Sequence, residues 1–189
     1  RQNKYPIYLT RHGESINNIL SIIGGDCDLS ENGYIYQKKL HKYITNDIKD
    51  DFIVFTSCLK RTKITAKLFT EKKIESRLLN EIHAGVCENM THQQIQDKYP
   101  TILKDRKVNK LEYRYPEGES YIDLFERLRG FVLQLGSFDK PILIVAHNAI
   151  IRVLLSYFQE IDKETIPHLN INLGQVIKLT PNSKYYNIE

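Results

Sequence analysis

The sequence predicts an α/β fold, because short apolar runs alternate with amphipathic stretches along its 189 residues. Residues 52–55 (Phe-Ile-Val-Phe) and 142–146 (Ile-Leu-Ile-Val-Ala) are wholly apolar, which is typical of strands buried on both faces. Residues 121–135 carry apolar side chains at steps of three and four, which predicts an amphipathic helix that ends near Gly136. A chain of this length can bury a full core, so we expect a single domain over residues 1–189.

The remaining elements are predicted from their boundaries. Residues 5–10 form a strand that leads directly into Arg11 and His12, and Ser30 is expected to cap the next helix. Further helices are expected over residues 59–70, 91–99 (stopped by Pro100) and 149–158, and an edge strand over residues 176–179.

The composition excludes several classes of protein. The net charge of +4 is too small to indicate nucleic-acid binding, and no apolar run approaches the ~20 residues of a membrane helix. Three scattered cysteines form no disulfide framework, so we expect a cytoplasmic protein. Neither CxxC nor HExxH occurs, so no metal or other cofactor is expected. Because the chain begins at Arg1 without Met, we expect it to be cut from a longer protein.

Polar side chains follow three of the predicted strands, at the point where each strand ends. They are Arg11 and His12, then the run from Ser57 to Arg61, and finally His147. Ligands of open α/β sheets bind beyond the carboxyl ends of the strands, so we expect these side chains to meet in one site.

The residue types around His12 indicate phosphoryl transfer. Gly13 lets the backbone approach a bulky anion, and the cation of Arg11 disfavours protonation, so His12 is expected to stay neutral and nucleophilic. Arg61 could grip a phosphoryl group bidentately near the start of a helix, and His147 could donate a hydrogen bond to the same oxygens.

The leaving group needs an acid, and two glutamates are candidates. Glu81 and Glu88 lie in one run, residues 79–88, and spacing does not choose between them. A carboxyl beside a phosphate is expected to hold its proton at neutral pH, which suits this task.

Other catalytic classes do not fit. A cysteine phosphatase loop needs Arg six positions after Cys, where this chain has Gly33, Ile64 and Gln93. The pair Asp26 and Asp28 resembles an aspartyl-phosphatase motif but follows two glycines rather than a strand. Neither GxSxG nor a P-loop occurs. A catalytically silent scaffold of the same fold is a further alternative, and the complete set of polar strand-end residues argues against it.

A second basic group follows later in the chain. Arg106, Lys110 and Arg114 recur every four residues, so on a helix they would share one face. From spacing alone, a solvated charged face is the simpler interpretation.

Together these residues resemble the histidine phosphatase superfamily, whose members have the phosphoglycerate mutase-like fold. The resemblance rests on Arg11-His12-Gly13 after a strand, Ser57-x-x-x-Arg61-Thr62, Glu81 and the late His147. Residues 23–26, 79–88, 113–121 and 173–181 are similar to one branch, the fructose-2,6-bisphosphatase domain of bifunctional 6-phosphofructo-2-kinase/fructose-2,6-bisphosphatases. The resemblance implies a three-layer α/β/α sandwich with a mostly parallel central sheet.

The resemblance also implies a role for each residue. His12 would attack the 2-phosphate of fructose 2,6-bisphosphate, while Glu81 would protonate the leaving oxygen and then activate water. Arg11, Arg61 and His147 would hold the transferred group, giving fructose 6-phosphate and phosphate and so controlling glycolysis and gluconeogenesis. The other implied substrate contacts are Asn18, Gly24, His92, Arg106, Lys110, Arg114, Tyr121, Asn148 and Arg152.

Three positions depart from the family pattern and bear on substrate choice. His92 stands where the family usually has Tyr, Asn148 where it has Gln, and Glu112 where it has Arg. The alternatives are therefore a sugar-phosphate phosphatase of broader specificity or a phosphoglycerate mutase of the same fold. The chain has no P-loop, so either the protein has a single function or a 6-phosphofructo-2-kinase partner domain lies upstream of Arg1.

Overall fold

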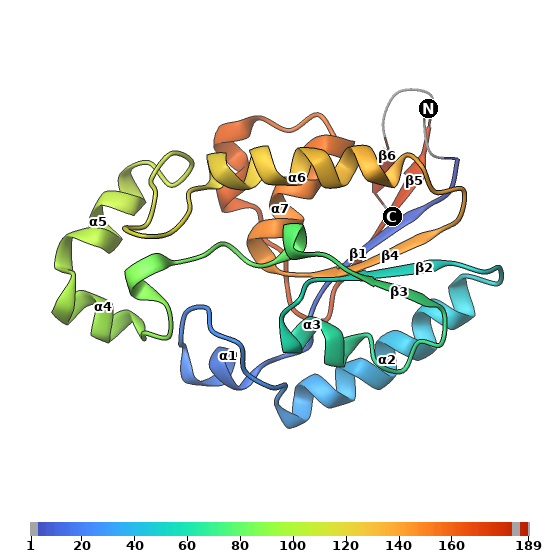
Figure 1. The fold of residues 1–189 in the computed structure, drawn as a ribbon, viewed down its shortest axis with the longest axis horizontal. Helices are drawn as coiled ribbons and strands as arrows, with labels where there is room; N and C mark the ends of the chain where they lie inside the picture. Colours follow the sequence, from blue (N-terminus) through green and yellow to red (C-terminus); the bar gives the residue numbers. More distant parts are fainter. Residues whose placement is uncertain (1–3, 183–185, 189) are drawn as a thin grey trace.

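The computed structural model describes residues 4–182 and 186–188, so Arg1 lies outside the described residues. Its centre is a six-stranded sheet with the strand order β3-β2-β4-β1-β5-β6 (Figure 1). The strands are β1 (Ile7–Arg11), β2 (Ile53–Thr56), β3 (Lys72–Glu75), β4 (Ile142–Ala146), β5 (Val176–Pro181) and β6 (Tyr186–Ile188). The first four run parallel, whereas β5 is antiparallel to β1 and β6 is antiparallel to β5. The predicted mostly parallel sheet is therefore confirmed.

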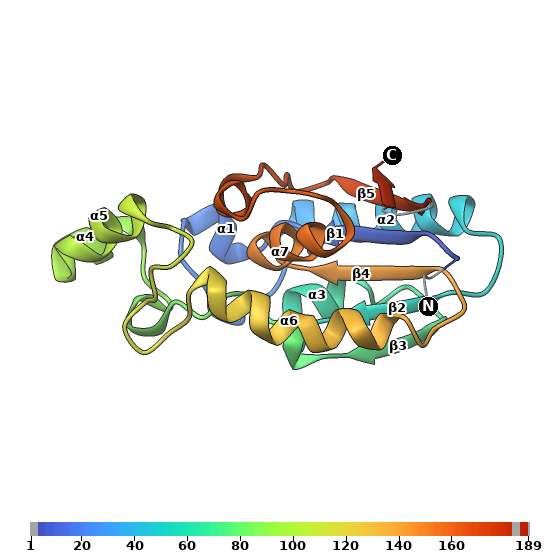
Figure 2. The ribbon, with the colours of Figure 1, turned by 90° about the horizontal axis from the view of Figure 1, so that it is seen from above.

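Helices cover both faces of this sheet (Figure 2). The helices α2 (Glu31–Asp47) and α3 (Lys60–Thr65) pack on one face, and α6 (Tyr121–Leu135) and α7 (Asn148–Phe158) on the other. Paired residues Leu9, Ile144 and Phe55 point toward α6 and α7, while Tyr8, Leu143 and Val54 point toward α2 and α3. Because alternate residues of a strand face opposite sides, each apolar run supplies both cores. The three-layer α/β/α sandwich is confirmed.

The shorter elements gather beyond the sheet. The helices α4 (His92–Lys98) and α5 (Pro100–Val108) form a small lobe, at the left of Figure 1, over the buried residues Ala84, Cys87, Ile95, Ile102 and Tyr115. The other short elements are α1 (Ile16–Leu20) and the 3₁₀ turns η1 (Arg77–Leu79), η2 (Gly85–Cys87) and η3 (Lys163–His168). No helix of the described residues is long and apolar enough to cross a membrane.

Several sequence predictions need correction. The strand at residues 176–179 is not an edge strand, because β5 pairs with β1 on one side and β6 on the other. The helix expected over 59–70 ends at Thr65. Pro100 stops α4 as expected, but it also begins α5, since the fixed φ of proline suits the first helical position. The strand β3 was not predicted, because three of its four residues are charged and exposed.

A contact between two glycines fixes the loop that follows β1. A Cβ on Gly13 would lie 2.7 Å from the carbonyl oxygen of Gly33, and a Cβ on Gly33 would lie 2.1 Å from that of Glu14. The Ser30 N–H also donates to the Glu14 carbonyl at 2.9 Å. The first turn of α2 therefore packs directly against the backbone that carries His12, and only glycine fits there.

We predict that Gly33→Ala destabilises the protein although alanine favours helix. The clash with the Glu14 carbonyl should outweigh the helix propensity and cost about 1–3 kcal/mol net. Urea unfolding measures this, with Gly130→Ala on α6 as the control, because a Cβ there meets nothing within 4 Å. The control should gain up to about 1 kcal/mol. A Gly33→Ala protein as stable as the control would contradict the proposed contact.

Candidate active site

The polar strand ends meet because their strands are neighbours in the sheet. The strands β2, β4 and β1 lie side by side in parallel, with Arg11 opposite Ala146 and Thr56 opposite Val145. The His12 N–H donates to the Ala146 carbonyl at 3.0 Å, which extends the pairing by one residue. As a result the ring centroids of His12 and His147 lie 5.2 Å apart. The predicted convergence of these residues is confirmed.

His12 is held as a neutral imidazole with one free nitrogen. The residue is 4% exposed, and Nδ1 lies 2.6 Å from the Gly13 carbonyl oxygen. Since a carbonyl only accepts, Nδ1 carries the proton and Nε2 keeps its lone pair. Burial, followed by the charges of Arg61 and Arg11, lowers the pKa of His12 from 6.5 to about 3. The imidazole of His12 is thus uncharged at neutral pH, as the sequence predicts.

His147 is fully buried and is positioned by Ser57. Its Nε2 lies 2.8 Å from Ser57 Oγ, which in turn lies 2.8 Å from Thr62 Oγ1 and accepts the Leu59 N–H. Burial and the charge of Arg61 hold the pKa of His147 well below its ordinary value. Its Nδ1 is buried with no hydrogen-bond partner in the described part of the chain. The sequence motif contains Ser57, but only the structure shows this contact.

The two arginines reach the imidazoles from different elements. Arg61, in the first turn of α3, is 5% exposed and donates to the Gly25 carbonyl at 2.7 Å. Arg11 ends β1, and burial lowers its pKa from the ordinary value, although the Glu81 carboxylate acts in the opposite direction. Both charges act on His12 and on His147. This arrangement can hold a phosphoryl group against either imidazole.

Backbone carbonyls of residues 167–171 hold three of the nearby cations. Lys110 Nζ donates to the Pro167 carbonyl at 2.9 Å, Arg152 Nε to that of Leu169 at 2.7 Å, and an Arg11 terminal nitrogen to that of Ile171 at 2.9 Å. Alternate carbonyls of one segment thus orient cations from β1, from α7 and from the loop that follows α5. Sequence reasoning missed this role, because a backbone acceptor has no side-chain signature.

The structure separates the two candidate glutamates. Each Glu88 oxygen accepts a backbone N–H at 2.8 Å, from Ala84 and Gly25, so Glu88 ties two loops together. Glu81 instead accepts the Ala149 N–H at 3.4 Å, and its carboxylate is the main opposite charge acting on Arg11. Glu81 is therefore the carboxyl placed beside the cations.

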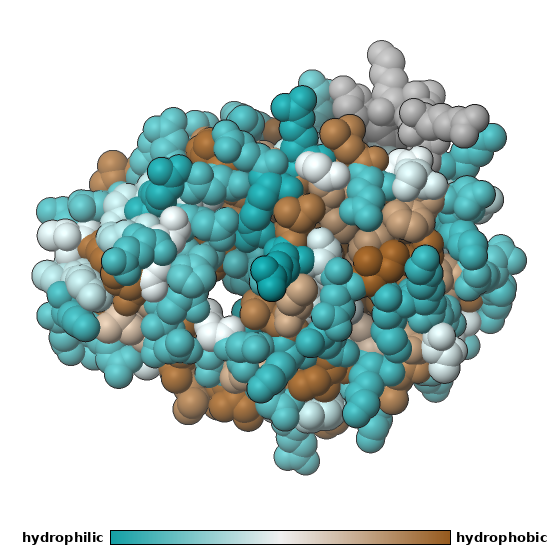
Figure 3. All heavy atoms as spheres, in the orientation of Figure 1, coloured by the Kyte–Doolittle hydropathy of each residue, from teal (hydrophilic) through white to brown (hydrophobic). Residues whose placement is uncertain are grey.

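A cavity of about 490 Å³ opens beside these groups and is lined by Gly24, Arg61, Glu81, His83 and Glu88, among others. In Figure 3 the surface is hollowed in the region where Figure 1 shows a gap between α1 and the green segment that leads to α4. Gly24 has φ +66°, and a Cβ there would collide with the Glu88 carboxylate.

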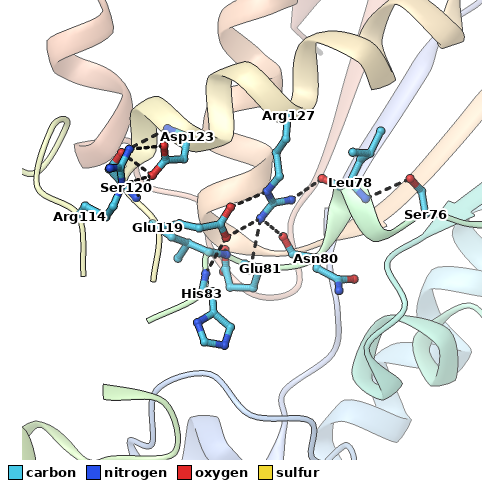
Figure 4. A network of polar contacts seen from close by, with 11 residues as sticks. Ser76, Leu78, Asn80, Glu81, His83, Arg114, Glu119, Ser120, Asp123 and Arg127 are labelled. Atoms are coloured by element: carbon cyan, nitrogen blue, oxygen red, sulfur yellow. Dashed lines mark hydrogen bonds and ion pairs between the residues drawn. The ribbon is translucent and has the colours of Figure 1, made fainter. Parts of the chain in front are cut away.

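The second basic group is only partly as predicted. Burial and the charges of Arg152 and Arg106 lower the pKa of Lys110 to about 8, so these three cations lie together. Arg152 also donates to Tyr121 Oη at 3.0 Å. The shared helical face is wrong, because α5 ends at Val108, before Lys110. Arg114 is not part of this group either: its exposed guanidinium pairs with Asp123 at 2.6 Å (Figure 4).

The remaining predicted contacts are distributed around this core. Asn18 Oδ1 accepts the N–H and the hydroxyl of Ser15 at the start of α1. Asn148 Oδ1 is buried without a partner among the described residues. His92 is exposed at the first residue of α4. Glu112 is exposed and accepts from Asn109 at 3.2 Å.

Residues 7–189 match the family model described as "Histidine phosphatase superfamily (branch 1)". The chain belongs to this superfamily.

Two curated relatives are similar to most of this chain. The chain is 42% identical over 176 residues to fructose-2,6-bisphosphatase of Saccharomyces cerevisiae, covering 93% of this chain and 39% of that protein. It is 43% identical over 175 residues to 6-phosphofructo-2-kinase/fructose-2,6-bisphosphatase 4 of Homo sapiens, covering 93% of this chain and 37% of that one. The chain thus spans about two fifths of the length of these relatives.

Solved structures agree on the fold. A putative alpha-ribazole-5'-P phosphatase from Escherichia coli superposes with a TM-score of 0.89 at 22% identity, covering 99% of this chain and 95% of that one. A mycobacterial glucosyl-3-phosphoglycerate phosphatase superposes with a TM-score of 0.84 at 21% identity, covering 98% of this chain and 97% of that chain.

We predict that the buried neutral state of His12 makes stability depend on pH. An unfolded chain protonates this histidine near pH 6.5, whereas the folded chain keeps it neutral down to about pH 3. In this pH range the unfolded state binds more protons than the folded state. The contribution of His12 to stability is therefore complete above pH 6.5 and falls as the pH drops toward 3.

The measurement is urea unfolding at about pH 7.5 and about pH 5, for wild type and His12→Ala. For one histidine the difference between these conditions is about 2 kcal/mol, and the variant should lose that much less on acidification. Equal losses in the two proteins would contradict the depressed pKa.

Proposed function

We propose that this chain hydrolyses the 2-phosphate of fructose 2,6-bisphosphate to give fructose 6-phosphate and inorganic phosphate. The observation that carries the proposal is a buried neutral His12 on which the charges of Arg61 and Arg11 act, with a second group of cations nearby. One group suits a phosphoryl group under attack, and the other suits a second phosphate on the same sugar. The names of the curated relatives support the same substrate.

In the first step, Nε2 of His12 attacks phosphorus, and the bond from phosphorus to the oxygen on C2 of the sugar breaks. Arg11, Arg61 and His147 stabilise the charge on the equatorial oxygens, with the Asn18 amide beside them. Glu81 gives its proton to the departing oxygen, which leaves as a hydroxyl. The product of this step is fructose 6-phosphate and a phosphohistidine.

In the second step, water replaces the sugar. Glu81, now a carboxylate, takes a proton from that water as it attacks phosphorus, and the bond to His12 Nε2 breaks. Inorganic phosphate leaves, with Glu81 protonated and His12 neutral again.

The 6-phosphate is assigned to Arg106, Lys110 and Arg152, with Tyr121 and Asn148 near the sugar hydroxyls. Gly24 lines the cavity beside Glu81 and was implied as a close approach to the sugar, and a side chain there would collide with the Glu88 carboxylate. Arg114 and His92 were implied as further contacts; their exposure makes them the weakest members of this set.

We further propose that residues 1–189 form one domain of a longer cytoplasmic protein that also carries a 6-phosphofructo-2-kinase domain. Full-length relatives named for both activities support this context. There the phosphatase would oppose the kinase and so regulate glycolysis. The alternative to the proposed fructose 2,6-bisphosphate hydrolysis is the activity of a sugar-phosphate phosphatase of broader specificity or of a phosphoglycerate mutase.

The phosphohistidine is tested directly with fructose 2,6-bisphosphate labelled at the 2-phosphate. Brief incubation should put acid-labile label on His12. His12→Ala should lose label and roughly 10³-fold or more of its activity, because the variant lacks the nucleophile. His41→Gln on α2 is the control and should match wild type. Turnover by His12→Ala at the wild-type rate would exclude the mechanism.

Equal wild-type rates on fructose 2,6-bisphosphate, fructose 1,6-bisphosphate and 3-phosphoglycerate would exclude the proposed substrate.

The 6-phosphate assignment is tested by Lys110→Gln. We expect KM for fructose 2,6-bisphosphate to rise about tenfold with kcat nearly unchanged, because a charge-assisted contact to the non-reacting phosphate is lost. The wild-type KM should also rise above pH 8, where the free Lys110 amine loses its proton. Lys107→Gln is the control, since Lys107 is exposed on the neighbouring α5. Equal changes in the two variants would remove Lys110 from the substrate site.

A further inference from the structure

The position of Glu81 depends on the backbone around it rather than on its own side chain. Glu81 lies in the irregular segment between η1 and η2. Among the described residues its carboxylate accepts only two hydrogen bonds, from the adjacent Ile82 N–H at 2.8 Å and from the Ala149 N–H at 3.4 Å. A group that must reach both a leaving oxygen and a water needs a fixed backbone beneath it.

Arg127 of α6 supplies that support (Figure 4). One terminal nitrogen donates to the Leu78 carbonyl at 2.5 Å, and the other donates to the carbonyls of Asn80 at 2.6 Å and Glu81 at 3.4 Å. One guanidinium therefore holds three carbonyls of the segment that carries Glu81. A lysine could not do so, because its ammonium is a single point and lacks the planar fork.

Glu119 completes the arrangement from the residue just before the cap of α6. Its carboxylate accepts from Arg127 Nε at 2.9 Å and from an Arg127 terminal nitrogen at 3.2 Å. The same Glu119 Oε1 also accepts the His83 N–H at 2.9 Å. The backbone is thus tied on both sides of Glu81, by Arg127 at Asn80 and by Glu119 at His83.

The way in which Arg127 uses its donors argues against direct substrate binding. Arg127 and Glu119 line the same cavity as Glu81, so access alone would allow a contact with ligand. Every nitrogen of the Arg127 guanidinium is already engaged by Glu119 or by a backbone carbonyl. Its charge is also neutralised by Glu119 within the pair, whose side chains are 19% and 25% exposed.

We propose that Arg127 is a positioning residue which, with Glu119, sets Glu81 for proton transfer to the leaving oxygen and from the attacking water. The proposal rests on the proposed function, in which Glu81 is the acid and the base. It assigns Arg127 no contact with substrate, so substrate affinity and proton transfer should separate in the variants.

The dependence on the leaving group distinguishes this role from a purely structural one. A sugar alkoxide needs a proton as it leaves, whereas p-nitrophenolate leaves without one. Arg127→Lys should therefore lower kcat on fructose 2,6-bisphosphate by about 10–100-fold, with KM within about twofold of wild type. The first-turnover release of p-nitrophenolate from p-nitrophenyl phosphate should stay within about threefold of wild type. Its steady state should slow, because the second step still needs Glu81.

Two further variants keep the experiment decisive. Glu119→Gln removes the partner charge from the other side and should give the same leaving-group dependence as Arg127→Lys. Arg129→Lys is the matched control, because Arg129 is exposed on the same helix, and it should behave as wild type on both substrates. Urea unfolding of all three variants at the assay temperature confirms that folded proteins are compared.

The proposal is overturned if Arg127→Lys and Glu119→Gln slow the first turnover of both substrates equally, or if neither slows hydrolysis of the sugar phosphate. A large rise in KM with unchanged kcat would instead make Arg127 a substrate contact. Failure of the proposed function looks different, because wild type itself would then not hydrolyse fructose 2,6-bisphosphate. In that case the same leaving-group comparison is made with a sugar phosphate that wild type does hydrolyse.

Discussion

The parallel pairing of β2, β4 and β1 is the constraint on which the site depends. Each of these strands is fully or almost fully buried and ends at the same edge of the sheet. Their register brings His12 and His147 to a centroid distance of 5.2 Å and places Ser57 next to His147. A shift of one residue in either pairing would turn the strand-end side chains to the other face. The glycine contact between the His12 loop and α2 then fixes the loop itself.

The site is electrostatically unbalanced, and this imbalance explains its chemistry. Arg11, Arg61, Arg152 and Lys110 act on one another or on the two imidazoles, while Glu81 is the carboxylate that acts on Arg11. Backbone carbonyls of residues 167–171 orient three of these cations without neutralising them. The phosphorylated ligand proposed here would supply the missing negative charge, so that binding would neutralise the site. Burial, together with the charges of Arg61 and Arg11, keeps both imidazoles neutral, which is the state that a nucleophile requires.

Much of the fold and of the central site could be predicted from local patterns. The apolar runs at β2 and β4, the caps Ser30 and Gly136, and the periodicity of α6 follow from side-chain chemistry that neighbouring residues share. The errors came where tertiary contacts override local pattern. The spacing of Arg106, Lys110 and Arg114 suits a helix, but α5 ends at Val108 and Arg114 turns to Asp123 instead. The residues of β5 predict an edge strand, because no local feature indicates that β6 pairs with it.

By itself the sequence determined which chemistry is possible: a strand-end histidine beside an arginine, a second histidine, and a choice of two carboxyls. These follow from residue identity and from the rule that parallel strands end at one edge. Spacing left Glu81 and Glu88 open and the family resemblance implied Glu81, but only the tertiary structure shows how they differ, because each carboxylate meets different backbone N–H groups. It also revealed Ser57 behind His147 and Arg127 beneath Glu81. Those residues act through contacts with backbone and side chains that lie 46 or more positions away in the chain, and such contacts exist only once the chain has folded.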